Sequence, residues 1–459
     1  MRYIRQALAM MREEKLFSTI HIAGTAMALA FTMVMAVVYY IKLAPIYPEA
    51  NRPRTVYFNG INVVTDERRG EASMPFGPTA LEEWFLSSPN IEYCAPTLLA
   101  CGNGKLRENC REFVFVGDGY TGIGEYFEAI INKTNADFFK IYEYDFVEGR
   151  PFTKQEVEGC EKVCVVSDIF AERIFGKDKD PIGQIVALER GEGLRVVGVV
   201  RSGSQLTPDS FADVFLPYTL WTVGRSDFSL YVGEFSIVAT VKDAEQLRAL
   251  KKELDEVAAR LSFDYVPITG GYRFFPEGTK THVELTQGLE THSIHALRAA
   301  TRKDEFDLES ISDWQLIRHF AALLFILLFV PALNLCGIVA GRMERRTAEM
   351  AVRKTFGARR STLLWQVVME NLVLTLIGGT IGLAAAWLGI YAFRTEILGM
   401  FFDSSTLNMT PIVEGEMLFA PLLFVGAFVA ILLINLLSAL LPAWLSLRKP
   451  IVESMMEKR

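Results

Sequence analysis

ERRTAEMAVRKTFGARRS occupies residues 344–361 and separates two stretches of apolar sequence. With Arg342 just before it, this connector holds seven basic side chains within 342–361. The apolar run before it ends at Ala340, and another begins soon after it. A short basic helix between two runs of membrane-spanning length is typical of a cytoplasmic connector in a multi-pass membrane protein.

Four apolar runs in the chain have no charged residue, namely 17–41, 320–340, 371–393 and 417–447. Each is at least as long as the ~20 residues that an α-helix needs to cross the ~30 Å hydrocarbon core. The first run is longer than the apolar part of a signal peptide and ends in bulky side chains. We therefore expect a retained anchor rather than a cleaved leader.

The distribution of charge predicts the orientation. Residues 1–16, the connector and the tail after Ser446 carry 15 basic and 6 acidic residues, although the whole chain has a net charge of −7. By the positive-inside rule, those three segments are cytoplasmic. We expect an inner-membrane protein with both termini cytoplasmic and a large periplasmic segment, whose acidic character argues against nucleic acid as a partner.

The predicted fold class is a four-helix transmembrane protein with a large mixed α/β periplasmic domain inserted between spans 1 and 2. The expected parts are a cytoplasmic amphipathic helix (1–16), span 1 (17–41), the periplasmic domain with its stalk (42–315), span 2 (316–341), the connector helix (342–361), span 3 (362–393), a periplasmic loop (394–416), span 4 (417–446) and a cytoplasmic tail (447–459).

Several patterns in the outer segment predict mixed α/β structure. Residues 234–243 alternate like a β-strand. Asp243 is placed to cap the helix that follows, with Gln246 three residues on. Residues 194–200 are nearly all apolar, as in a buried strand. Residues 280–310 are charged and helix-prone, and we expect them to form a stalk leading to span 2.

The sequence offers no catalytic motif. It contains neither G-x-x-x-x-G-K-[ST] nor H-E-x-x-H, so we expect no ATPase site, no metal and no cofactor in this chain. His292 and His295 are spaced to share a helix face, but no carboxylate or cysteine stands beside them. We interpret them as a solvated face rather than a metal site.

Five of the six cysteines lie in the outer segment, where disulfides are permitted. The spacing offers two pairs, Cys160 with Cys164 and Cys101 with Cys110. The odd count leaves one thiol free or bonded between chains.

Gly378, Gly382, Ala386 and Gly389 form a stripe of small residues along span 3. Such stripes let membrane helices approach closely, so we expect close helix packing near a dimer interface. Helix over 361–393 would measure roughly 50 Å at 1.5 Å per residue. That length would let the first third of the helix project beyond the bilayer.

Residues 345–383 resemble the signature of the FtsX/MacB superfamily of ABC transporter permeases. That signature is a basic pair, an acidic residue, an apolar-R-[KR]-x-apolar-G-A segment, and a glutamate leading into a G-G-x-x-G helix. The matching residues are Arg345, Arg346, Glu349, Val352, Arg353, Lys354, Phe356, Gly357, Ala358, Glu370, Gly378, Gly379 and Gly382. Residues 136–153 and 170–200 also resemble segments of the MacB-type periplasmic core domain, and residues 441–455 loosely resemble the closing segment of the family.

The resemblance implies that residues 316–446 form an FtsX-like permease domain in one half of a dimer, paired with a second copy or a paralogue. It implies a separate cytoplasmic ATPase that binds the ATP, and mechanical transmission across the membrane. It also makes the connector a coupling helix for that ATPase, with the residues Glu349, Arg353, Lys354, Phe356, Gly357 and Ala358.

The chemistry of the connector suits docking. Val352 and Phe356 share an apolar face, Glu349 and Arg353 form an i,i+4 pair in the favourable order, and Gly357 is a natural residue to follow a helix end. The alternative is that the basic residues only hold the helix against anionic lipid.

The implied function is export with a periplasmic adaptor and an outer-membrane channel. Three other functions stay open: lipoprotein release like that of the LolCDE system, FtsX-like activation of wall hydrolases or peptide sensing, and a membrane receptor without an ATPase. The connector signature weighs against the last.

Overall fold

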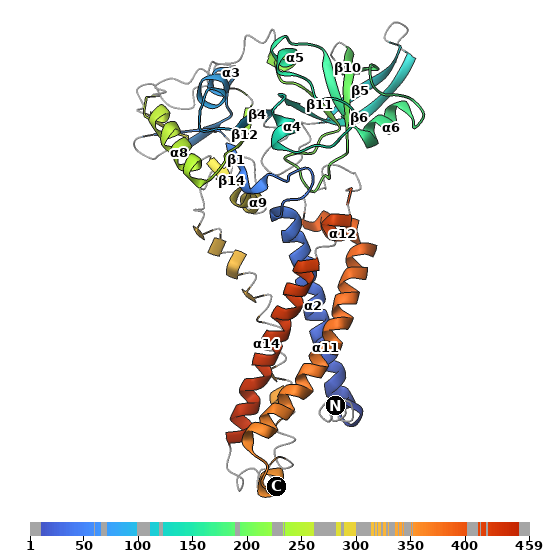
Figure 1. Cartoon of the computed structure of the whole chain (residues 1–459), viewed down its shortest axis with the longest axis vertical. Helices are drawn as coiled ribbons and strands as arrows, with labels where there is room; N and C mark the ends of the chain where they lie inside the picture. The colour runs from blue at the N-terminus through green and yellow to red at the C-terminus, as the bar shows by residue number, and fades with distance from the viewer. Residues whose placement is uncertain are drawn as a thin grey trace. The chain divides into compact units, whose positions relative to one another are not determined.

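Three long apolar helices form the membrane part of the protein (Figure 1). The computed structural model describes residues 11–58, 60–65, 71–98, 111–118, 123–188, 193–222, 233, 235–260, 281–285, 289–299, scattered positions from 314 to 343, 350, 352–401, 412–413, 415–418 and 421–448. The chain divides into a membrane unit (Met1–Tyr40, Ser312–Ile397 and Gly415–Arg459) and an outer unit (Ile41–Ile311 and Leu398–Glu414).

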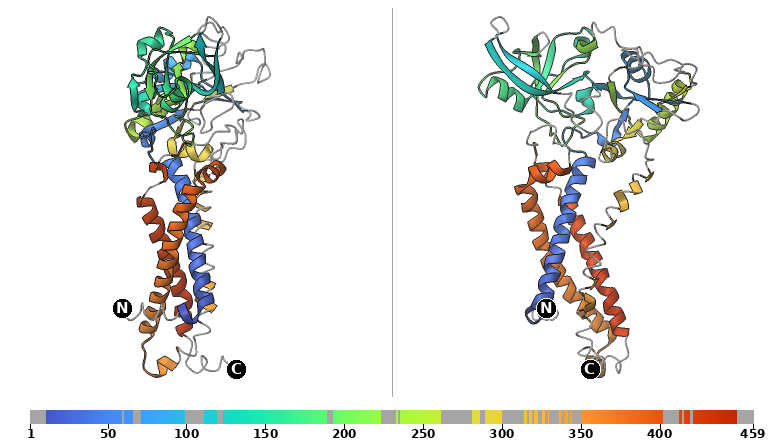
Figure 2. Two further views of the ribbon diagram at one scale, coloured as in Figure 1. Left: turned by 90° about the vertical axis from the view of Figure 1, so that its right-hand side faces the viewer. Right: turned by 180° about the vertical axis from the view of Figure 1, so that it is seen from behind.

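The helices of the membrane unit are α2 (Lys15–Leu43), α11 (Arg360–Ala392) and α14 (Pro421–Arg448). Among the described residues, these three are long and apolar enough to cross a membrane, the stretch of α14 being Phe424–Trp444. Figure 2 shows them side by side from two further directions. Pro331 and Asn334 of the expected second span lie outside the described residues.

The membrane unit has a small apolar core at the end where α11 begins and α14 ends. It joins the end of the second apolar run to the start of α11 and the end of α14, and its buried members are Val339, Met343, Met350, Leu363, Val367, Ala439 and Ala443. Near the opposite end of that run, Tyr39 of α2 and Phe320 meet edge to face, with ring centroids 5.8 Å apart.

The outer unit contains a seven-stranded mixed sheet in the order β7-β10-β8-β11-β6-β5-β9. Its strands are β5 (Arg111–Asp118), β6 (Ile123–Thr134), β7 (Phe146–Gly149), β8 (Val163–Ser167), β9 (Ile185–Leu188), β10 (Gly193–Val200) and β11 (Val214–Pro217). Because β9 also pairs with the start of β10, six of these strands form a closed ring of hydrogen-bonded neighbours. The central strand β8 is buried along its whole length, as its sequence VCVVS requires.

A second, four-stranded antiparallel sheet has the order β14-β1-β12-β4. It comprises β1 (Thr55–Phe58), β4 (Tyr93–Leu98), β12 (Phe235–Thr240) and β14 (Leu289–Thr291). A three-stranded sheet of β13 (Thr281–Glu284), β2 (Ile61–Thr65) and β3 (Glu71–Met74) completes the strands.

Short helices cover or connect the sheets of the outer unit. They are α3 (Pro78–Ala80), which continues into a π-helical turn at Leu81–Leu86, α4 (Phe138–Ile141), α5 (Lys154–Glu158), α6 (Asp168–Phe175), α7 (Thr219–Thr222), α8 (Ala244–Ala258) and α9 (His292–Ala299). Two more short helices, α12 (Arg394–Phe401) and α13 (Gly415–Leu418), lie between α11 and α14.

The strand–helix unit predicted around Asp243 is confirmed. β12 is followed by α8, and the Asp243 carboxylate accepts hydrogen bonds from the backbone amides of Glu245 and Gln246. The Gln246 side chain accepts from the amide of Lys242, one residue before the capping residue. The buried strand predicted at 194–200 is β10.

The prediction of a helical stalk over 280–310 is wrong for its first part. Residues 281–284 and 289–291 are the strands β13 and β14, and helix begins only at His292. Both strands find partners far away in sequence, β2 and β1 respectively, and these pairings outweigh local helix preference. Residues 301–310 lie outside the described residues.

Candidate functional site

The described part of the connector is a short, firmly terminated helix. Residues 352–355 are helical, and Gly357 has a φ of +89°. The amide of Gly357 donates to the carbonyl of Lys354, and the amide of Ala358 donates to that of Arg353, both at 3.0 Å. This pair of bonds is the Schellman arrangement, in which the left-handed residue follows the helix end. The prediction for Gly357 is therefore confirmed.

The connector presents apolar side chains to its surroundings. Phe356 is 88 % exposed and Val352 is 42 % exposed. Ala358, in contrast, packs against the small apolar core where α11 begins and α14 ends. Glu349 lies outside the described residues, as do Arg345 and Arg346. An exposed phenylalanine on a helix fixed at its end is a surface suited to a protein partner.

A chain of polar side chains joins the connector to α11. Arg353 Nη1 donates to Gln366 Oε1 at 3.0 Å, and Gln366 Nε2 donates to Glu370 Oε1 at 3.0 Å. Glu370 is buried on the helix. The sequence pointed to Arg353 and Glu370 but not to Gln366, although its position one turn before Glu370 on the same face was a signal.

Two glycines of the small-residue stripe hold α11 against α2 of the same chain. A Cβ on Gly382 would lie 2.5 Å from the carbonyl oxygen of Ala26, and one on Gly378 would lie 2.8 Å from that of Ile22. Close helix packing is thus found against the first span, while the expected position near a dimer interface stays a prediction. Gly389 has no neighbour within 4 Å of an added Cβ.

Polar contacts support the same packing. His21 Nε2 of α2 lies 3.5 Å from Thr375 Oγ1 of α11. Asn435 of α14 donates to Thr25 Oγ1 of α2, also at 3.5 Å. The stripe residue Ala386 is buried, as are Gly378 and Gly382. The three described spanning helices therefore share one packed interior.

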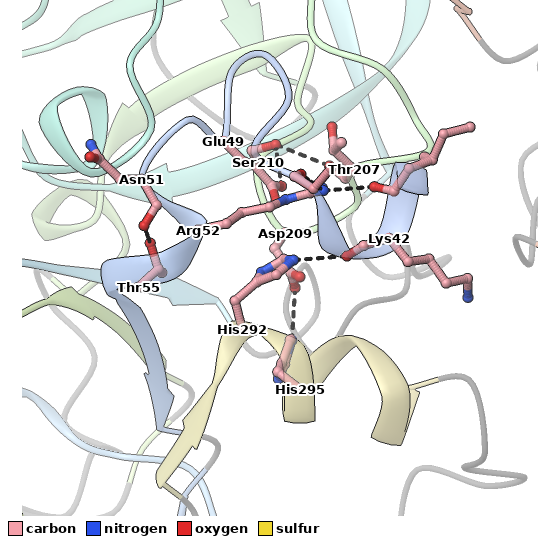
Figure 3. Close-up of polar contacts among 12 residues, drawn as sticks. Lys42, Glu49, Asn51, Arg52, Thr55, Thr207, Asp209, Ser210, His292 and His295 are labelled. Carbon is pink, nitrogen blue, oxygen red and sulfur yellow. Dashed lines mark hydrogen bonds and ion pairs between the residues drawn. The ribbon is translucent and has the colours of Figure 1, made fainter. Parts of the chain in front are cut away.

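The outer end of α2 is held by a buried arginine (Figure 3). The Arg52 guanidinium donates to the carbonyl of Ile41 at 2.7 Å and to that of Ala44. It also donates to Glu49 Oε2 at 2.7 Å, and Ser210 Oγ donates to Glu49 Oε1 at 2.7 Å. Arg52 thereby satisfies carbonyls that the helix end leaves without partners, and Glu49 neutralises it.

A histidine from α9 holds the same helix end. His292 Nε2 lies 2.9 Å from the carbonyl of Lys42, and the Tyr57 hydroxyl lies 3.1 Å from His292 Nδ1. Burial, together with the charge of Arg52, lowers the pKa of His292 to about 4. The ring is therefore neutral at pH 7, so Nε2–H donates to the carbonyl while Nδ1 accepts from the hydroxyl.

His295, one turn further on, is buried between two carboxylates. Its Nδ1 lies 3.0 Å from Glu290 Oε2 and its Nε2 lies 3.3 Å from Asp209 Oδ1. Burial alone would lower its pKa, but the charge of Asp209 and hydrogen bonds to both carboxylates raise the pKa to about 9. The imidazolium stacks on the ring of Tyr57 with centroids 4.1 Å apart.

Our interpretation of His292 and His295 as a solvated face was wrong, since both are buried. The residues that bury them come from elsewhere in the chain, so spacing within the helix gave no indication of them. Within the described residues, no group of three or more His, Cys, Asp or Glu side chains is arranged to hold a metal ion.

Comparison with known proteins decides the family. Residues 18–257 match the MacB-like periplasmic core domain, and residues 321–451 match the FtsX-like permease C-terminal domain. The chain belongs to the MacB/FtsX family of ABC transporter permeases. The seven-stranded sheet of the outer unit thus belongs to its periplasmic core domain, and α11 and α14 belong to its permease domain.

Individual relatives of the permease are distant. It is 24 % identical to the uncharacterized ABC transporter permease YknZ of Bacillus subtilis, over 64 % of each chain. It is 24 % identical to the macrolide export ATP-binding/permease protein MacB of a Shewanella species, over 68 % of this chain and 41 % of that protein. It is also 24 % identical to the pyoverdine export ATP-binding/permease protein PvdT of Pseudomonas aeruginosa, over 57 % and 34 %. The chain thus matches less than half of each of the two exporters.

The described cysteines of the permease are free. Cys160 is partly exposed and Cys164 is buried on β8, where burial raises the pKa of its thiol to about 12. The disulfide proposed between them is therefore not formed, since Cys164 belongs to a central strand and points into its core. Cys101 and Cys110 lie outside the described residues, so that pair stays a prediction.

Proposed function

We propose that the permease transmits ATP-driven motion from a separate cytoplasmic ATPase to its periplasmic domain. The observation that carries the proposal is the connector helix, which exposes Phe356 and is joined to α11 through Arg353 and Gln366. An ABC transporter permease works with an ATPase, and the connector supplies a suitable surface for one. We also assign Glu349 and Lys354 to the proposed ATPase docking surface.

The contacts support one route for this motion from the connector to the periplasmic domain. Force on the connector reaches α11 through the bonds from Arg353 to Gln366 and on to Glu370. α11 packs on α2 with almost no space at Gly382, so the two helices move together. The outer end of α2 is bonded to the periplasmic domain by Arg52. Each step is a packed or hydrogen-bonded contact of the kind that carries coupling.

Export is the purpose that we favour for this motion, with the work done alongside a periplasmic adaptor and an outer-membrane channel, in a dimer with a second copy or a paralogue. Two of the relatives reported above are named for export, one of a macrolide and one of pyoverdine.

The docking surface is tested by replacing Phe356. Phe356→Asp should abolish co-purification with the partner ATPase, because burying a phenylalanine contributes about 1.5–3 kcal/mol. That corresponds to a roughly ten- to hundredfold change in affinity. The assay is pull-down from detergent extract followed by ATP hydrolysis in nanodiscs.

Phe356→Leu is the matched control, since it keeps an apolar side chain and should retain the ATPase. Wild-type recovery of the ATPase with Phe356→Asp would show that the connector only meets lipid. The transmission proposal would then lose its starting point.

A further inference from the structure

Residues 201–211, in the connection from β10 to β11, form a largely buried loop with several polar contacts. Its hydroxyl side chains Ser202, Ser204, Thr207 and Ser210 are all buried. We call residues 201–211 the junction loop. It crosses between two strands of the seven-stranded sheet, so any force on it is passed directly to that sheet.

The junction loop is bonded to the chain that leaves the first span. Ser210 donates to Glu49, the residue that pairs with Arg52 at the end of α2. At the other end of the loop, the Tyr47 hydroxyl donates to the carbonyl of Arg201 at 2.8 Å, and the Arg201 guanidinium lies over the Tyr47 ring. The segment after α2 is therefore bonded to both ends of the junction loop.

The same loop is bonded to the helix that precedes the second apolar run. Asp209 pairs with His295 of α9 at 3.3 Å, and both side chains are almost fully buried. The backbone around this contact is fixed, because the hydroxyl of Tyr144 donates to the carbonyl of Ser210. A buried ion pair of this kind is strongly weakened when one partner is removed.

The loop also holds the segment between α12 and α13, which connects the third and fourth membrane runs. Ser204 Oγ donates to the carbonyl of Ile412, and the amide of Ile412 donates to Gln205 Oε1 at 2.7 Å. Ile412 thus has both of its backbone groups satisfied by two adjacent residues of the junction loop. Its side chain packs against the main core of the outer unit.

We propose that the junction loop links the three segments of the outer unit that connect to membrane runs, so that loosening one loosens the others. It contacts the segment after α2, helix α9 and the loop at Ile412. These segments lie more than a hundred residues apart in sequence and meet at one eleven-residue loop. The linkage itself is independent of the proposed function. Only its use, which is to deliver motion from several spans to one sheet, rests on that function.

The test is hydrogen–deuterium exchange of the full-length permease in nanodiscs, without an ATPase. Gln205→Ala removes the acceptor of the Ile412 amide at a half-buried position that tolerates a smaller side chain. We expect faster exchange at Ile412 and also, by about fivefold, in residues 42–55 and 292–299. Fivefold is the change that losing one ordinary hydrogen bond produces in an opening equilibrium.

Ser210→Ala provides the reciprocal variant, since it should speed exchange at Ile412 although the described hydrogen bonds of its hydroxyl go to Glu49 and to Thr207 of the loop itself. Ser236→Ala is the control, because Ser236 is buried in β12 and its hydroxyl has no hydrogen-bond partner. It should leave all three segments unchanged.

Exchange that rises only at residues 203–206 and 412 in Gln205→Ala would overturn the linkage, as would equal acceleration by Ser236→Ala. Both outcomes are independent of ATPase binding. A failure here is therefore distinct from a failure of the Phe356 test.

Discussion

His292 and His295 show that one helix can place two imidazoles where their pKa values shift in opposite directions. Burial and the positive charge of Arg52 lower the pKa of His292 to about 4, although its ring bonds the carbonyl of Lys42. His295 faces Asp209 and Glu290, and its pKa is raised to about 9. One ring acts as a neutral hydrogen-bond donor, and the other as a buried cation.

The raised pKa of His295 predicts a pH dependence. Because the folded-state pKa of about 9 lies above the ordinary 6.5, the proton stabilises the folded domain fully below pH 6.5, and this contribution is lost as the pH rises to about 9. Its size is on the order of 3 kcal/mol. His295→Gln should lower the Tm in detergent by several degrees at pH 6.5 and by far less at pH 9.5.

The Tm of the wild-type permease and that of His295→Gln are measured by intrinsic fluorescence at each pH. The difference between the two Tm values separates the effect of His295 from that of other titrating groups. A pH-independent difference would mean that His295 is neutral in the fold.

At the level of residues, the sequence predicted those whose partners are close in the chain. Asp243 as a cap and Gly357 after a helix end depend only on neighbours within a few positions. Ser210, which reaches Arg52 through Glu49, and Asp209, which pairs with His295, lie far from those residues in the chain. They come together only once the sheets have formed. Spacing along a single helix carries no information about them.

Among the helices of the membrane unit, α11 makes close contacts through its glycines. Gly378 and Gly382 leave room for the backbone of α2, and Gly379 faces the ring of Phe428 in α14. A side chain at these positions would force the helices apart, since two of the nearest atoms belong to the backbone and are unable to rotate away.

Gly382→Ala is therefore expected to destabilise the membrane unit by about 1–3 kcal/mol, the usual cost of overpacking. Gly389→Ala is the control on the same helix, because it has open space and alanine favours helix. The measurement is the Tm of each variant in the same detergent, together with ATPase activity after reconstitution. Equal Tm values for the two variants would mean that α2 and α11 are not packed at Gly382.

The elements that the sequence misjudged are those stabilised by distant pairing. Apolar alternation identified β12 and the apolar run identified β10, since each is patterned for burial. Residues 281–291 look helical locally, yet β13 and β14 pair directly with β2 and β1, which lie more than two hundred residues earlier. No local pattern predicts such a partner.

At the scale of the whole molecule, Gln366 is the test of transmission from inside to outside. Gln366→Leu should leave the ATPase bound, because Phe356 is untouched, while breaking the link from Arg353 to Glu370. ATP would then be hydrolysed without changing hydrogen exchange in the periplasmic domain. A full nucleotide-dependent response in this variant would show that the link is dispensable.

The overall plan of the molecule followed from the sequence because long uncharged runs and basic connectors are strong signals. The matches of residues 18–257 and 321–451 agree with that plan. Several contacts on which the proposals depend did not follow from the sequence, since Arg52 and the junction loop show no distinguishing pattern.

The hold on the end of α2 has one consequence for the kind of movement that passes through it. Arg52 bonds the carbonyl of Ile41, and His292 bonds that of Lys42. Consecutive carbonyls point about 100° apart around a helix axis. A helix end bonded in two such directions resists rotation about its own axis as well as displacement along it.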